Sequence, residues 1–206
     1  MLTREITWLV LITVGLNICL HCSTVFAQSE TGTGDNPTMQ TTTSNTTMAE
    51  RARQTYDALI EHYYVDELNL YRGHNEVQDD GRAFAELWPY SGVVSALNAL
   101  ATMPDGGEAY HDDLRRVLDG LQQYYDPYGP HPGYDSYVRE FGGGQKYYDD
   151  NEWLGLDFLL AYHTLGDPVY LERAKITFDF AVSGWSESDG GIYWRENDLS
   201  TGNTCT

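Results

Sequence analysis

The sequence predicts an all-α fold in which an inner ring of buried helices is wrapped by an outer ring. From Met48 to residue 183, apolar residues recur at three- and four-residue spacing, which is the period of one helix face. Helices that are apolar on nearly every side alternate with helices that carry one apolar stripe, as buried and covering helices do. We expect about five helices in the 206 residues, too few to close two rings, so the predicted fold is incomplete in this chain.

The first three helices are expected before residue 122. The first begins at Met48 and has a single apolar stripe, made of Ala52, Tyr56, Leu59, Ile60 and Tyr63. The second begins within 86–91 and is predicted to be buried, with apolar residues at Val93, Val94, Ala96, Leu97 and Leu100. The third follows the turn at 105–108, and its apolar residues are Leu114, Val117, Leu118 and Leu121.

The segment 126–144 connects the third helix to the fourth and is rich in Gly and Pro. We expect no helix or strand in it, because it is polar and contains many chain-breaking residues. Ordered loops of this length are often functional. The fourth helix is expected to be capped by 149–151, to be apolar on most sides and to end at Leu165.

A clear helix boundary follows at 166–168. Gly166 is expected to end one helix, Asp167 to cap the next, and Pro168 to occupy its first turn. The fifth helix is predicted to be amphipathic, with a stripe made of Leu171, Ala174, Phe178 and Ala181. A turn at 188–191 then leads into a short strand at 192–194, which gives a hairpin-like terminal segment, and the rest of the chain is expected to be a polar loop.

Residues 1–27 have the pattern of an export signal. Arg4 precedes an apolar run at 6–20, and the segment 25–27 places small residues where a signal peptidase reads. We predict cleavage after Ala27 and a secreted or cell-envelope protein. The apolar run is short and interrupted, so no stable membrane insertion is expected; an uncleaved anchor is the alternative.

Residues 28–47 are rich in Thr and Ser and show no apolar pattern, which predicts a disordered linker before a folded domain at 48–206. A lipid anchor at Cys19 or Cys22 is a weaker alternative to signal cleavage, because the residues before each match a lipobox poorly. After cleavage only Cys205 remains, so neither a cysteine nucleophile nor a cysteine metal site is expected.

The formal net charge is −19, from 12 basic and 31 acidic residues. Such a surface repels a phosphate backbone, so nucleic acid is not expected as a partner. A neutral polysaccharide is not repelled, although the charge is equally compatible with a role in solubility alone. Sixteen Tyr and five Trp favour a sugar ligand, because aromatic rings stack on sugar rings.

Asp149 and Asp150 are the candidate catalytic residues. They follow the Gly-rich segment, have aromatic neighbours on both sides, and begin a helix that is expected to be buried. Adjacent carboxylates at a helix start are also favoured as simple caps, and the pair alone does not distinguish the two interpretations. The spacing matches no EF-hand loop and no His-Glu-x-x-His run exists, so no metal site is predicted.

Three segments together resemble glycoside hydrolase family 76. They are Tyr-Tyr-Asp-Asp-Asn-Glu-Trp-Leu-Gly-Leu at 147–156, Gly-Asp-Pro-Val-Tyr-Leu-Glu-Arg-Ala-Lys at 166–175, and Gly-Gly-Ile-Tyr-Trp-Arg-Glu at 190–196. The similarity extends from about Arg51 to the last residue. It implies an (α/α)6 toroid and a retaining endo-α-1,6-mannanase that hydrolyses α-mannan backbones through a glycosyl-enzyme intermediate, without a cofactor.

The resemblance also implies roles for single residues. Asp149 would be the nucleophile and Asp150 the general acid/base, which requires two carboxyl groups about 5–5.5 Å apart. We expect the pKa of Asp150 to be the raised one of the two. The candidates for sugar contacts are Tyr148, Trp194, Tyr147, Trp153, Tyr193, Trp88 and Tyr90, with Tyr148 and Trp194 favoured. For each of them, an ordinary core or rim aromatic is the alternative.

Two other functions remain open from the sequence. A mannose-specific transglycosylase of the same family would use the same carboxylates but exclude water from the glycosyl-enzyme. A non-catalytic glycan-binding fragment would keep the aromatic contacts without turnover. Helical toroids serve several chemistries, so the residues around 149–150 carry the functional prediction and the fold alone does not.

Overall fold

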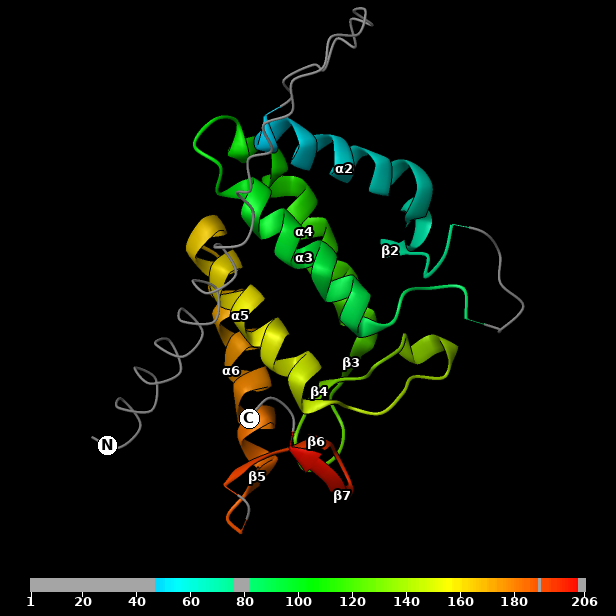
Figure 1. Cartoon of the computed structure of the whole chain (residues 1–206), viewed down its shortest axis with the longest axis vertical. Helices are drawn as coiled ribbons and strands as arrows, with labels where there is room; N and C mark the ends of the chain where they lie inside the picture. Colours follow the sequence, from blue (N-terminus) through cyan, green and yellow to red (C-terminus); the bar gives the residue numbers. More distant parts are fainter. Residues whose placement is uncertain (1–46, 76–81, 189, 204–206) are drawn as a thin grey trace, which may run out of the picture. The chain divides into compact units, whose positions relative to one another are not determined.

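A computed structural model describes residues 47–75, 82–188 and 190–203. The predicted signal at 1–27, its cleavage point after Ala27, and the linker up to residue 46 lie outside the described residues. In the described part, five α-helices dominate, and the all-α prediction is confirmed (Figure 1). The helices are α2 (Met48–Tyr63), α3 (Leu87–Ala101), α4 (His111–Gly120), α5 (Tyr148–Leu165) and α6 (Pro168–Ser183).

Helix ends follow local sequence chemistry closely at two places. Thr47, which the sequence assigns to the linker, is the N-cap of α2 and forms a capping box with Glu50. Gly166 adopts a left-handed conformation (φ 71°) after α5, and the Asp167 carboxylate accepts a hydrogen bond from the Val169 N–H at the start of α6. The predicted boundary at 166–168 is therefore confirmed.

The start of α5 differs from the prediction. The helix begins at Tyr148, and its N-cap residue is Tyr147, which makes no side-chain capping hydrogen bond. Asp149 and Asp150 consequently lie inside the first helical turn instead of capping it. Asn151 also lies inside the helix, and its side chain is hydrogen-bonded to other parts of the chain.

Short antiparallel strands connect the helices. The strands are β1 (Tyr64–Val65), β2 (Leu70–Tyr71), β3 (Tyr125–Asp126), β4 (Gly133–Tyr134), β5 (Trp185–Ser186), β6 (Gly191–Arg195) and β7 (Asp198–Asn203). Strand β1 pairs with β2, β3 with β4, and β6 lies between β5 and β7. The predicted strand at 192–194 lies within β6 and pairs with β5, as expected of the hairpin-like segment. The polar loop expected after it was wrong, because 198–203 form strand β7, which pairs with β6.

The expectation that 126–144 contains no element was wrong. Asp126 pairs with Gly133 and Tyr125 with Tyr134 to form a two-residue ladder, and a 3-10 helix spans Arg139–Phe141. Further 3-10 helices span Asp66–Leu68, Gly107–Tyr110 and Leu121–Tyr124. Gly133 also lets β4 lie close to α6, since a Cβ there would be 3.1 Å from Phe180 Cγ.

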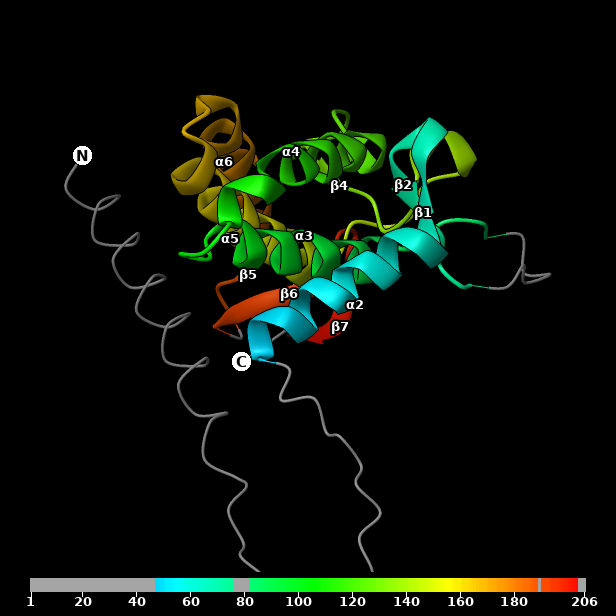
Figure 2. The same ribbon diagram turned by 90° about the horizontal axis from the view of Figure 1, so that it is seen from above.

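Helix α5 is the centre of the packing, because it contacts α6 along its length and also packs against α3 (Figures 1 and 2). Leu154, Phe158 and Ala161 of α5 are fully buried in the core. Helix α3 contributes the largest group of buried residues, including Leu87, Tyr90, Val94, Leu97 and Leu100, and in turn packs against α2 and α4.

The predicted apolar stripe on α6 is shifted. Ala174 and Ala181 are buried as expected, but Leu171 and Phe178 are only half-buried, and Tyr170, Thr177 and Phe180 are buried instead. Thr177 can be buried because its hydroxyl donates to the Ala174 carbonyl oxygen at 3.0 Å. It also lies against α5 where Gly155 leaves space, since a Cβ on Gly155 would be 3.0 Å from Thr177 Oγ1.

The apolar side chains on α5 are divided between two environments. One side faces the core, while Trp153, Leu156 and Leu160 are 46%, 45% and 50% exposed. The prediction that α5 is apolar on most sides is correct in composition, but only one side is buried in this chain. Among the described helices, none is both long and apolar enough to cross a membrane.

Two glycine-to-alanine changes provide a matched test of the packing. Gly92 lies on the exposed side of α3 with no atom within 4 Å of where a Cβ would lie, whereas a Cβ at Gly120 would lie 2.1 Å from Tyr90 Oη and 2.3 Å from the Asn69 carbonyl oxygen. We expect Gly92→Ala to raise the free energy of unfolding by about 0.5–1 kcal/mol. Gly120→Ala should lower it by about 1–3 kcal/mol. Urea unfolding followed by circular dichroism measures both, and equal stability of the two variants would contradict the packing.

Candidate active site

The two candidate catalytic carboxylates lie in different environments within one helical turn. Asp149 is half-buried, and its Oδ1 accepts a hydrogen bond from the Asp150 N–H at 3.1 Å. Asp150 is 9% exposed, and no described residue makes a hydrogen bond or ion pair with its carboxyl group. The Asp149 carboxylate is therefore engaged by a backbone N–H of its own helical turn, whereas the Asp150 carboxyl group has no such contact.

Burial raises the pKa of Asp150 to about 7, and the neighbouring charge of Asp149 contributes in the same direction. A helix start favours ionised carboxylates, so desolvation must exceed that effect at Asp150. A carboxyl group with this pKa still holds its proton in a large fraction of molecules near neutral pH. It can therefore donate a proton, as a general acid must.

Glu152 is a third carboxyl group at this site that the sequence analysis did not single out. Burial raises its pKa to about 7, and the charge of Asp149 again contributes. Residues three apart are neighbours on a helix surface, so the spacing from Asp149 to Glu152 is the sequence signal that could have revealed it. Glu152 is half-buried, and it is a second group here that can hold a proton near neutral pH.

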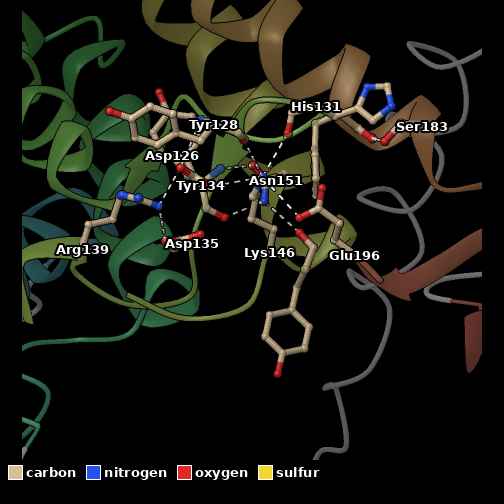
Figure 3. A network of polar contacts seen from close by, with 12 residues as sticks. Asp126, Tyr128, His131, Tyr134, Asp135, Arg139, Lys146, Asn151, Ser183 and Glu196 are labelled. Atoms are coloured by element: carbon tan, nitrogen blue, oxygen red, sulfur yellow. Dashed lines mark hydrogen bonds and ion pairs between the residues drawn. The ribbon is translucent and has the colours of Figure 1, made fainter. Parts of the chain in front are cut away.

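Asn151 fixes the first turn of α5 against strand β4. It is completely buried, its Oδ1 accepts from the Tyr134 N–H at 2.8 Å, and its Nδ2 donates to the Tyr134 carbonyl oxygen at 3.0 Å (Figure 3). The same Nδ2 donates to the Tyr147 carbonyl oxygen at 2.8 Å. The amide thus pairs with both backbone groups of one strand residue, which holds the turn that carries Asp149 and Asp150 in place.

Four of the aromatic candidates form two pairs, each of which joins a residue before Asp149 in the sequence to one after Asp150. Tyr147 and Trp194 have ring centroids 5.2 Å apart, and Trp88 and Trp153 form an edge-to-face pair at 6.1 Å. The three Trp residues are also well exposed, at 43% for Trp194, 46% for Trp153 and 54% for Trp88. Exposed aromatic faces of this kind can stack on sugar rings.

The remaining aromatic candidates are held within the protein. The ring of Tyr148 is nearly fully buried and stacks on Phe180 with centroids 4.7 Å apart, and its sugar contact stays a prediction. The Tyr193 hydroxyl donates to Ser186 Oγ at 3.2 Å, which ties it to β5. Tyr90 is completely buried, and its hydroxyl donates to the carbonyl oxygens of Asn69 and Val117.

A substitution at Asp150 tests the cause of its pKa. The folded-state pKa of about 7 lies above the ordinary value of 3.8, so the folded protein binds this proton more tightly than the unfolded chain does. Stability is then lost as the pH rises from about 4 through 7. We expect Asp150→Asn to raise the free energy of unfolding at pH 8 by about 2–4 kcal/mol, with little change at pH 4.

The measurement is urea unfolding of Asp150→Asn at both pH values. Asp57→Asn is the matched control, because Asp57 is exposed on α2. If both variants show the same pH dependence, burial of Asp150 is not the cause of the shift.

Removing the Asn151 side chain tests the attachment of α5 to β4. Asn151→Ala leaves the Tyr134 N–H and carbonyl groups without their side-chain partner in a buried position. We expect the free energy of unfolding to fall by about 2–4 kcal/mol. Asn75→Ala, at an exposed position, should change it by less than about 0.5 kcal/mol. Equal thermal midpoints for the two variants would show that the amide does not hold the turn.

Several solved structures that resemble this chain are glycoside hydrolases of family 76. A family 76 mannosidase from Bacteroides thetaiotaomicron VPI-5482 is 27% identical with a TM-score of 0.65, over 75% of this chain and 43% of that one. A family 76 glycoside hydrolase from a bovine Bacteroides thetaiotaomicron strain is 26% identical with the same TM-score, over 75% of this chain and 34% of that one. No curated protein matched the sequence.

A third structure is similar in fold. It is an inactive variant of an α-1,6-mannanase from Salegentibacter sp. HEL1_6, with two consecutive aspartates changed to asparagine, in complex with α-1,6-mannotriose. It is 20% identical with a TM-score of 0.54, over 72% of this chain and 38% of that one. This chain therefore spans less than half the length of each of the three relatives, and its helices form part of an α/α toroid.

The sequence also matches the family profile described as glycosyl hydrolase family 76 over residues 47–206. This match includes Asp149 and Asp150, which we call the acid pair, together with both aromatic pairs and all five described helices. The chain belongs to glycosyl hydrolase family 76.

Proposed function

We propose that this chain carries the catalytic carboxylates of a retaining endo-α-1,6-mannanase. The observation that supports this most directly is the unequal burial of two consecutive aspartates in a family 76 chain. Asp150 has a pKa raised to about 7, whereas Asp149 is more open and lies beside it. A retaining glycosidase needs such a difference, because one carboxyl group must be ionised while the other holds a proton.

In the proposed reaction, the Asp149 carboxylate attacks the anomeric carbon of a mannose unit. Asp150 gives its proton to the glycosidic oxygen as the bond to the departing sugar breaks, which leaves a glycosyl-enzyme ester on Asp149. Asp150, now ionised, then takes a proton from a water molecule that attacks the same carbon and releases Asp149. The stereochemistry at the anomeric carbon is retained because it is inverted twice.

The two aromatic pairs support a polymeric substrate. Tyr147 with Trp194 and Trp88 with Trp153 offer ring faces on elements that adjoin the first turn of α5. In this proposal a chain of sugar units stacks on both pairs and extends past the two aspartates, as an endo-acting enzyme requires. The α-1,6 linkage is proposed from the relatives, one of which is an α-1,6-mannanase in complex with α-1,6-mannotriose.

The test is hydrolysis of α-1,6-mannan by the chain and its variants. Asp149→Asn and Asp150→Asn should each lower kcat by about 10²–10⁴-fold or more. Glu152→Gln is the matched comparison, because Glu152 has a similarly raised pKa, and we expect it to retain kcat within about tenfold. Full activity in Asp149→Asn would contradict the assignment, and a greater loss in Glu152→Gln than in Asp150→Asn would transfer the acid role to Glu152.

A substrate with a good leaving group separates the two aspartate roles. A dinitrophenyl α-1,6-mannobioside needs no proton on its leaving oxygen, so the first step should survive in Asp150→Asn but not in Asp149→Asn. A burst of dinitrophenol from Asp150→Asn followed by slow turnover is the expected result. Equal loss of the burst in both variants would contradict the division of roles.

A glycan-binding function is the second candidate, because the exposed rings of Trp88, Trp153 and Trp194 can stack on sugars whether or not turnover follows. Binding of α-1,6-mannotriose without release of reducing ends from mannan would identify this function. For a transglycosylase, mannosyl transfer to an added acceptor sugar would exceed hydrolysis.

We also propose that residues 1–27 direct export and are then removed. Detection of a mature protein that begins at Gln28 would test this.

A further inference from the structure

Lys146 is a buried cation next to the proposed active site that the proposed chemistry does not use. It is 5% exposed, and its Nζ lies 3.2 Å from Glu196 Oε2 and 3.3 Å from Asp126 Oδ2 (Figure 3). Nζ also donates to the carbonyl oxygen of His131 at 3.0 Å and approaches that of Tyr128 at 3.5 Å. We call these five residues the Lys146 cluster.

The cluster constrains the chain because a buried ammonium group is costly unless it is paired and hydrogen-bonded. Its partners come from two segments that are distant in sequence: the end of β3 with the turn that follows it, and the residue directly after β6. Asp126 is also shared with Arg139, whose Nη1 lies 2.7 Å from Asp126 Oδ1. Any displacement of either segment would therefore leave charged groups unpaired inside the protein.

The end of β6 is attached to the same place through its backbone. The Glu196 N–H donates to the Lys146 carbonyl oxygen at 2.9 Å, and Tyr147 forms an antiparallel bridge with Arg195. Arg195 Nη1 also donates to Gln145 Oε1 at 2.7 Å. Residues 145–147, which lead directly into α5, thus hold the β6–β7 hairpin by both main-chain and side-chain contacts.

Trp194 is the residue that this attachment positions. It lies two residues before Glu196, is 43% exposed, and has its ring 5.2 Å from that of Tyr147. We propose that the ion pair between Glu196 and Lys146 sets the position of Trp194 relative to the acid pair and so determines affinity for the sugar that stacks there. Glu196 is then a positioning residue. This inference rests on the proposed function, because it concerns binding of the same mannan chain.

Glu196→Gln is the variant to examine. It removes the charge and keeps both the backbone hydrogen bond and an acceptor for Lys146, whereas a change at Lys146 would leave Asp126 and Glu196 without their shared cation. Glu187→Gln is the matched control, because Glu187 is exposed in the turn before β6. Both changes are made together with Asp149→Asn and Asp150→Asn, so that α-1,6-mannotriose can be bound without being cleaved.

Two measurements are made on each variant: calorimetric binding of α-1,6-mannotriose, and hydrogen exchange of the Tyr193 and Glu196 amides. We expect Glu196→Gln to raise the dissociation constant about tenfold and to speed exchange of both amides at least tenfold. Glu187→Gln should alter neither value, and circular dichroism should show the same helix content in both.

Each other outcome has a distinct meaning. Unchanged affinity in Glu196→Gln overturns the positioning role while the proposed function stands. If the parent chain binds no mannotriose, the proposed ligand is wrong, and exchange alone then decides whether the ion pair holds the hairpin. Unchanged exchange in that case also overturns the inference.

Discussion

The burial of Lys146 is the constraint on which the arrangement around the acid pair depends. An ammonium group that is 5% exposed must have anionic partners, and the chain provides Asp126 from one side and Glu196 from the other. These partners bring the β3–β4 turn and the end of β6 to the residue that lies three positions before Asp149. The loops around the site are therefore fixed by electrostatics as much as by apolar packing.

The same distribution of charge leaves the acid pair without a cation. Lys146 and Arg139 are both engaged by carboxylates outside the pair, and no described residue forms an ion pair with Asp149 or Asp150. A neighbouring cation would lower the pKa of Asp150, whereas burial and the charge of Asp149 raise it. Keeping the cations occupied elsewhere is thus part of what allows Asp150 to hold a proton near neutral pH.

Sequence reasoning succeeded where the determining chemistry is local and failed where it acts over long separations. The boundary at 166–168 was predictable because each of its residues acts within one or two positions of itself. The family resemblance made 149–150 the candidate catalytic residues, because composition and spacing alone did not separate them from a helix cap. Asn151, by contrast, pairs with the backbone of Tyr134, 17 residues earlier, and Lys146 pairs with Glu196, far later in the chain. No local pattern marks such partners, because their positions are set by the ladder of β3 with β4 and by the docking of β6.

Helix geometry explains how two adjacent aspartates acquire different properties. Successive side chains on an α-helix project about 100° apart, so neighbours point toward different surroundings. Asp149 lies on the side of α5 that also carries Trp153 and Leu156, both exposed, whereas Asp150 turns toward the buried side. Glu152 projects on the opposite side of Asp149 from Asp150, about 60° from Asp149 and one turn farther along. Asp150 and Glu152 therefore face different surroundings, and the deeper burial of Asp150 favours it as the proton donor.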